Sequence, residues 1–276
     1  MGRFDNVLIV TDIDGTFLAR DNSIPKRNMT ALKCFLSEGG KFAFATGRVH
    51  QSLLVSIPMV NELVSSPCIM ANGAYLYDFS TEKMLGKRFV DVESARKVAE
   101  FMHDNYQEVG IRYSSTGGTS YCRFPPNYLG TYEREAYKDA PILEKKDWDF
   151  TDCYKIVVRG KCEILDEMRR RVGEKFSGVF ELVKSGDTFF EIQTKGCTKG
   201  SAIGSLREFY KEKGSDVVVY ACGDFENDIS MLKAADVAVC PENACEAVKQ
   251  ISDLVLCSCD EGLIGDLVNE IEKRVE

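Results

Sequence analysis

The chain has 276 residues, of which 44% are hydrophobic and 28% are charged, and its formal net charge is −8. This length suits one core with an inserted domain, and the composition excludes a disordered chain. The sequence has no apolar run long enough to span a bilayer and no long basic stripe, so neither a membrane nor nucleic acid is expected as a partner.

The eleven cysteines are scattered along the chain and form no Cys-x-x-Cys pair. This usage is typical of reduced thiols that pack as small core residues. Cys222 lies beside a polar motif, but no histidine is near it in sequence to activate a thiol, so we expect it in the core. Residues 1–6 are too few and too polar for a secretory signal, and the sequence predicts a cytoplasmic protein.

The two ends of the chain alternate strands and helices. The apolar run at 7–10 is continuous, as expected of a parallel strand covered on both faces. The other elements predicted there are helix 25–36, strand 42–45, strand 69–70, helix 198–213, strand 217–221, helix 227–235, strand 237–240, helix 244–251, strand 254–257 and helix 261–274. This alternation predicts the α/β class with a Rossmann-like parallel sheet.

The middle of the chain has a different, α+β pattern. Turn signals such as Gly117-Gly118 separate neighbouring strand candidates, as in hairpins. The predicted elements are helices 92–106 and 164–176 and strands 110–113, 119–124, 154–158, 179–183 and 189–192. We therefore expect a core formed by residues 1–80 and 194–276 and an inserted domain formed by 81–193.

Two carboxylates, Asp12 and Asp14, follow the first predicted strand directly. Ligands of open parallel sheets bind beyond the carboxyl ends of the strands. Two carboxylates at such a position repel each other, and a cation between them offsets that cost. Taken alone, the segment could also be a surface turn in which an aspartate caps a helix.

The sequence resembles the haloacid dehalogenase superfamily of phosphohydrolases through four motifs that occur in the family's order. They are Asp12-Ile13-Asp14-Gly15-Thr16, Thr46-Gly47-Arg48, Lys199-Gly200 and Gly223-Asp224-Phe225-Glu226-Asn227-Asp228. Two further segments, Asn72-Gly73-Ala74 and Glu242-Asn243-Ala244, resemble the Cof-type branch, subclass IIB, which inserts a large cap between the second and third motifs.

The resemblance implies a magnesium-dependent phosphatase that works through an aspartyl phosphate. It makes Asp12 the nucleophile and Asp14 the general acid and later the base. The implied metal residues are Asp12, the Asp14 carbonyl, Asp224 and, less directly, Asp228. The implied phosphate-binding groups are Thr46, the Gly47 amide, Lys199 and Asn227. Arg48 could form a surface ion pair or contact substrate, and Thr16 is expected to stabilise its turn.

Alternatives to this function remain open. A phosphomutase of the same fold begins with the same step, and a phospho-receiver domain also uses an aspartate cluster, a threonine and a lysine around magnesium. A third alternative is a catalytically silent binding protein. The expected partner is a small phosphorylated metabolite, with hexose phosphates first and cofactor monophosphates such as flavin mononucleotide or pyridoxal phosphate next. The sequence leaves the oligomeric state open.

The inserted domain is expected to close over Asp12 as a mobile lid, with hinges at 79–81 and 194–196. The resemblance implies that this cap contacts the leaving group of the substrate. The side chains proposed for that contact are Tyr113, Thr116, Tyr121, Arg123 and Tyr128.

Overall fold

The computed structural model describes residues 2–124 and 137–275, which divide into two compact units. Unit 1 comprises the chain up to Gly86 together with the chain from Thr198 onward, and unit 2 comprises Lys87–Cys197. In the described part of the chain, no helix has the length and apolar character needed to cross a membrane.

Unit 1 is built on a five-stranded sheet with the order β13-β12-β11-β1-β2, in which every neighbouring pair is parallel. All five residues of β1 are buried, which explains why its first four residues are all apolar. The predicted Rossmann-like parallel sheet is thereby confirmed. The strands are β1 (Val7–Thr11), β2 (Lys41–Phe44), β11 (Val218–Cys222), β12 (Val237–Pro241) and β13 (Leu254–Leu256).

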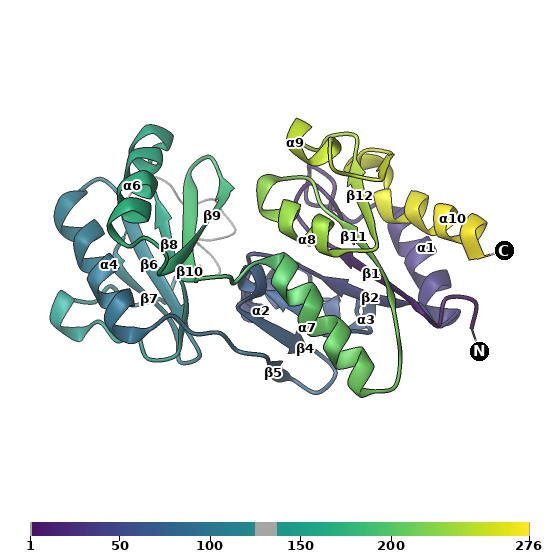
Figure 1. Cartoon of the computed structure of the whole chain (residues 1–276), viewed down its shortest axis with the longest axis horizontal. Helices are drawn as coiled ribbons and strands as arrows, with labels where there is room; N and C mark the ends of the chain where they lie inside the picture. Colours follow the sequence, from purple (N-terminus) through teal and green to yellow (C-terminus); the bar gives the residue numbers. More distant parts are fainter. Residues whose placement is uncertain (1, 125–136, 276) are drawn as a thin grey trace. The chain divides into compact units, whose positions relative to one another are not determined.

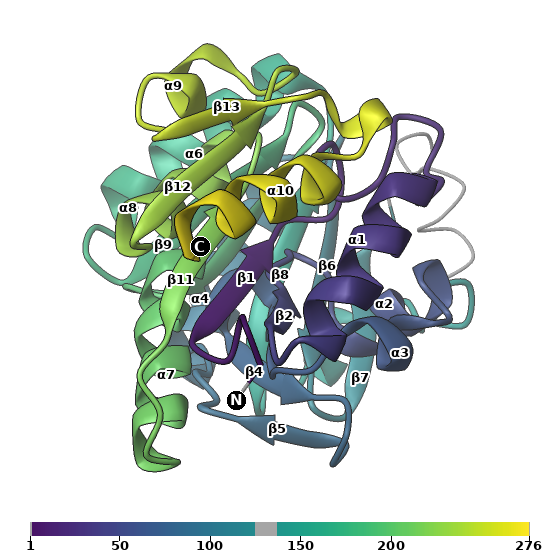
Figure 2. The same cartoon turned by 90° about the vertical axis from the view of Figure 1, so that its right-hand side faces the viewer.

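Helices cover both faces of this sheet. Right-handed connections that leave β1 and β11 in opposite directions place their helices on opposite faces. Accordingly α1 (Lys26–Ser37) contacts α10 (Leu263–Val275), and α7 (Lys199–Glu212) contacts α8 (Ile229–Ala234). Figure 1 shows these two pairs on opposite sides of the sheet, and Figure 2 shows α1 and α10 from their own side.

A small antiparallel sheet continues unit 1 beyond β2. It consists of β3 (Cys68–Met70), β4 (Tyr75–Asp78) and β5 (Lys83–Leu85). A parallel bridge between Ala45, which follows β2, and Ile69 of β3 joins this sheet to the larger one. Because β5 pairs with β4, the expected hinge at 79–81 is instead the connection of a hairpin within unit 1. The chain leaves unit 1 only after Gly86.

Several short elements of unit 1 differ from the expectation. The helix expected at 244–251 is only α9 (Glu246–Lys249), and the one expected at 227–235 begins as a 3-10 turn at Glu226–Asp228 before α8. Two helices, α2 (His50–Ser56) and α3 (Val60–Leu63), were not predicted. Short elements of this kind carry too few residues to show a periodicity.

Unit 2 is an antiparallel sheet with two helices on one face, as the α+β pattern predicted. The strand order is β7-β6-β8-β10-β9, and the helices are α4 (Val92–Asn105) and α6 (Cys162–Lys175). The strands are β6 (Gly110–Ser115), β7 (Gly118–Arg123), β8 (Cys153–Arg159), β9 (Phe180–Gly186) and β10 (Phe189–Thr194).

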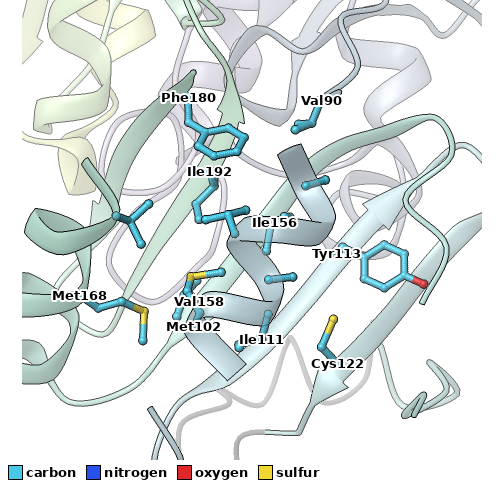
Figure 3. Close-up of a cluster of buried hydrophobic side chains, with 14 of the residues drawn as sticks. Val90, Met102, Ile111, Tyr113, Cys122, Ile156, Val158, Met168, Phe180 and Ile192 are labelled. Atoms are coloured by element: carbon cyan, nitrogen blue, oxygen red, sulfur yellow. The ribbon is translucent and has the colours of Figure 1, made fainter. Parts of the chain in front are cut away.

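The two faces of the unit 2 sheet differ in chemistry. Alternate residues such as Ile111, Ile156 and Ile192 join the buried cluster beneath the helices, where Met102 and Met168 meet them (Figure 3). The residues between them, Arg112, Lys155 and Glu191, belong to the other face and are also buried. Lys155 Nζ lies 2.6 Å from Glu191 Oε1, and the two side chains are only 3% and 4% exposed.

We predict that Lys155→Met destabilises unit 2 by about 3–5 kcal/mol, because it removes the Lys155 ammonium from beside the buried carboxylate of Glu191. The double variant with Glu191→Leu should recover most of that loss. Urea unfolding followed by the fluorescence of Trp148, the chain's single and buried tryptophan, measures both.

The matched control is Arg170→Ala, which breaks an ion pair with Glu174 whose side chains are both 62% exposed. Its cost should stay below about 1 kcal/mol. A cost for Lys155→Met as small as that of the control would show that the buried pair does not stabilise unit 2.

Candidate active site

The four motifs meet at the carboxyl edge of the unit 1 sheet. Asp12 follows β1, Thr46 follows β2, and Asp224 follows β11. Parallel strands bring these positions to one edge, and backbone bonds fix their register there. The Asp12 amide donates to the Cys222 carbonyl at 2.8 Å, and the Ala45 amide donates to the Thr11 carbonyl at 2.8 Å.

Lys199, the first residue of α7, is the centre of the site. Its Nζ donates to Asp12 Oδ1 and to Asp228 Oδ1, at 2.6 Å each, and its side chain is completely buried. Burial acts to lower the pKa of Lys199, but the two carboxylates outweigh it and hold the pKa above its usual value. Lys199 is therefore a fixed positive charge between the two aspartates.

The carboxylates of the site exceed the positive charge that Lys199 provides. Burial raises the pKa of Asp12 well above its usual range, Asp228 and Asp224 add to the rise, and Lys199 opposes it. Burial, reinforced by Asp228, also raises the pKa of Asp224 to about 6. One carboxylate oxygen from each of Asp12, Asp224 and Asp228 lies within 4.8 Å of the others. This all-oxygen, electron-rich donor set fits a hard divalent cation.

Asp228 differs from the other two in how its oxygens are used. Oδ1 accepts from Lys199, and Oδ2 accepts from the backbone N–H groups of Asp224 at 3.0 Å and Phe225 at 3.2 Å. Asp228 is fully buried. Its carboxylate thus ties the turn after β11 to α7.

The turn after β1 is shaped around Asp224. Gly15 has φ +78°, and a Cβ there would lie 2.5 Å from Asp224 Oδ2. Thr16 Oγ1 donates to Asp224 Oδ1 at 2.7 Å, so Thr16 stabilises the site through its hydroxyl. Asn243 Nδ2 donates to the Gly15 carbonyl at 2.8 Å. Asn243 is part of a segment that resembles the Cof-type branch, but the sequence assigned it no role. Its position after the parallel strand β12 places it at the same edge of the sheet.

Arg48 forms an ion pair with Asp14. Its Nη2 lies 2.5 Å from Asp14 Oδ1 and its Nε lies 3.2 Å from Oδ2, so the guanidinium grips the carboxylate with two bonds. The Asp14 side chain is 55% exposed, whereas that of Arg48 is 17% exposed. The sequence left open whether Arg48 forms an ion pair or contacts substrate. The structure contains the ion pair, and its partner is Asp14 of the first motif.

The remaining motif groups surround this centre. Thr46 is buried, and its Oγ1 accepts from the Arg48 amide at 3.1 Å, which leaves the hydroxyl proton for another acceptor. Gly47 lies between these two residues and is half-buried. Asn227 Nδ2 donates to Asn72 Oδ1 at 3.4 Å and retains a second N–H.

Cys222 is fully buried at the end of β11, as expected of a core residue. Burial raises the pKa of its thiol, which opposes a thiolate nucleophile. The eleven cysteines all lie in the described part of the chain and are free thiols.

The side chains of unit 2 proposed for the leaving group have contacts of their own. Tyr113 and Tyr121 are buried, and Tyr113 belongs to the cluster under the helices. Arg123 donates to the carbonyls of Tyr106 and His103, and Thr116 donates to Asp152. Tyr128 lies outside the described residues. The contacts described for these four residues lie within unit 2, and their role in binding a leaving group stays a prediction.

Gly200 allows α7 to approach α8 closely. A Cβ at Gly200 would lie 2.2 Å from the Ser230 carbonyl oxygen, and the Gly200 amide donates to Ser230 Oγ at 3.1 Å. Thr198 caps the N-terminus of the helix, and its side chain and that of Ser201 form a capping box. Both features set the position of Lys199, which lies between Thr198 and Gly200.

Comparison with known proteins gives a consistent result. The family model for haloacid dehalogenase-like hydrolases matches residues 9–266. A phosphoglycolate phosphatase of Methanopyrus kandleri is 28% identical over 250 residues, which cover 90% of this chain and 90% of the relative. A 5-amino-6-(5-phospho-D-ribitylamino)uracil phosphatase of Bacillus subtilis is 22% identical over 286 residues, which cover 95% of this chain and 97% of the relative.

Solved structures share the fold. One is described as a sugar phosphatase of haloacid dehalogenase subclass IIB, and it superimposes with a TM-score of 0.79 at 23% identity. The match covers 96% of this chain and 99% of that structure. Both flanks and the insert therefore belong to one recurring fold.

We predict that Gly200→Ala destabilises the protein by about 1–3 kcal/mol and lowers its activity, because the added methyl pushes α7 away from Ser230. The control is Gly204→Ala in the same helix, where a Cβ would meet nothing within 4 Å. That change should stabilise the helix by about 0.5–1 kcal/mol. Denaturant midpoints and phosphate release are compared for both, and equal behaviour of the two variants would contradict the close-packing role of Gly200.

Proposed function

The chain belongs to the haloacid dehalogenase-like hydrolase family, and its fold is that of a subclass IIB sugar phosphatase; from this premise we propose that it is a magnesium-dependent phosphatase of small phosphorylated metabolites. The observation that carries the proposal is the buried Lys199, which joins Asp12 to Asp228 within reach of Asp224. Curated relatives over nearly the whole chain are named as phosphatases.

The metal would be held by the Asp12 carboxylate, the Asp14 carbonyl and Asp224, with Asp228 in support. Their oxygen chemistry and spacing suit magnesium, which binds few protein ligands and keeps several waters. When bound, the ion neutralises negative charge on the transferring phosphoryl group.

We propose that the chain's own residues divide the work as follows. Thr46, the Gly47 amide, Asn227 and Lys199 bind phosphoryl oxygens, and an oxygen of Asp12 attacks phosphorus. The phosphorus–oxygen bond to the leaving group breaks as Asp14 gives that oxygen a proton. Asp14 then takes a proton from a water molecule, whose oxygen attacks the aspartyl phosphate and releases inorganic phosphate.

Unit 2 would act as the cap that selects substrates, since it interrupts unit 1 between the second and third motifs. The substrate class is proposed from the similar proteins, whose names include a phosphorylated hydroxy acid, a phosphorylated ribityl compound and a sugar phosphatase. Sugar phosphates therefore come first, and cofactor monophosphates second. A phosphomutase would share the first step but pass the phosphoryl group to a sugar hydroxyl.

We predict that Asp12→Asn abolishes turnover, because an amide lacks the nucleophilic oxygen. Asp14→Asn should reduce hydrolysis of an alkyl phosphate by roughly 100- to 10,000-fold, the usual effect of losing a proton donor. Its effect on kcat/KM for dinitrophenyl phosphate should be much smaller, since that leaving group needs no proton. The two substrates are compared in kcat/KM, which reports only the steps up to departure of the leaving group and so leaves out the later base role of Asp14; folding is checked by circular dichroism. An Asp14→Asn loss of kcat/KM that is equal for both substrates would exclude the acid role.

We predict that a chelator removes activity, that magnesium restores it, and that calcium inhibits it. Calcium takes about 6–8 oxygens and accepts carboxylates with both oxygens, so it would occupy the Asp12 oxygen needed for attack. As a readout independent of activity, magnesium should raise the melting temperature of the wild type more than that of Asp224→Asn. Full activity in chelator, or equal support by calcium, would refute the metal requirement.

A further inference from the structure

The turn formed by Ala71, Asn72 and Gly73 has an unusual backbone. All three residues have positive φ, at 49°, 52° and 98°. For residues other than glycine such a conformation costs on the order of 1–3 kcal/mol and persists only where the surroundings impose it. Ala71 and Asn72 are 0% and 1% exposed, so this strain lies inside unit 1.

The backbone of this turn holds the second motif from both ends. The Asn72 amide donates to the Thr46 carbonyl at 2.9 Å, and the Ala71 amide donates to the Arg48 carbonyl at 2.8 Å. These two bonds enclose Gly47, whose own N–H is proposed to bind phosphate. The left-handed conformation is what turns two successive amides toward this segment.

The side chain of Asn72 reaches a second motif. Its Oδ1 accepts from Asn227 Nδ2 at 3.4 Å, across 155 positions of sequence. Asn227 belongs to the 3-10 turn after β11 and is proposed to donate its remaining N–H to phosphate. The bond to Asn72 therefore orients the amide of Asn227.

The same turn also touches the start of α7. A Cβ on Gly73 would lie 2.2 Å from the carbonyl oxygen of Thr198, the residue that precedes Lys199. Three separate segments that supply proposed phosphate-binding groups thus meet at one strained turn.

We propose that Asn72 is a positioning residue for phosphate binding, which aligns the Thr46–Arg48 segment through its backbone and Asn227 through its amide. Asparagine meets both requirements, because it tolerates left-handed φ better than most residues and offers an acceptor oxygen. Glycine would meet only the first. The inference rests on the proposed phosphatase function and adds a residue to that site.

The test compares Asn72→Gly with Ala71→Gly. Both changes ease a positive φ, so neither adds strain to the fold. Only Asn72→Gly removes the contact with Asn227, while Ala71→Gly keeps its amide and that contact. Ala71→Gly should therefore match the wild type in kcat/KM and in the affinity for inorganic phosphate measured by calorimetry with magnesium. Asn72→Gly should weaken phosphate binding by about 3- to 10-fold, the usual effect of one lost hydrogen bond, without a fall in melting temperature.

Asn227→Ala, alone and combined with Asn72→Gly, completes a double-mutant cycle. If Asn72 acts through Asn227, the combined loss of phosphate affinity is smaller than the product of the single losses. The proposal is overturned if Asn72→Gly binds phosphate as Ala71→Gly does, or if it loses stability while phosphate affinity is retained. A wild type that neither releases nor binds phosphate would instead refute the proposed function itself.

Discussion

The buried ammonium of Lys199 is the constraint on which the unit 1 site depends. A buried charge costs several kcal/mol unless it is paired with good geometry, and here Asp12 and Asp228 both approach Nζ to 2.6 Å. Asp12 follows β1, Asp228 ends the 3-10 turn after β11, and Lys199 itself is the first residue of α7. The register of the parallel strands and the close approach of α7 to α8 must therefore both be correct for the charge to be satisfied.

The same constraint explains why so many donors point at carboxylates. Lys199 cannot compensate all of the aspartates of this site, so other groups act on them. The Thr16 hydroxyl serves Asp224, two backbone amides serve Asp228, and the Arg48 guanidinium serves Asp14. What remains is an excess of negative charge centred on Asp12 and Asp224. This charge favours a bound cation, and it disfavours an anion such as phosphate unless a cation is bound as well.

The sequence predicted the parts of the structure that depend on burial and on strand ends. Continuous apolar runs identified β1 and its neighbours because both faces of a parallel sheet are covered, and the motif residues followed because strand ends share an edge. It missed β4 and β5, whose exposure follows no single period. It also left the partner of Arg48 open and gave Asn72 no role. Pairings across 34 and 155 positions, and a positive φ at a residue that is not glycine, leave no periodic trace in one sequence.

Thr198 is both the first residue of unit 1 after the insert and the cap of the helix that begins with Lys199. Its capping box with Ser201 is closed entirely on the unit 1 side of that joint. The N-terminal cap of α7 is therefore complete without any residue of unit 2. Insertions, deletions or wholesale exchange between Gly86 and Thr198 would leave the register of the lysine untouched. Changes of sequence in unit 2 are thus separated from Lys199 by the helix cap that Thr198 forms.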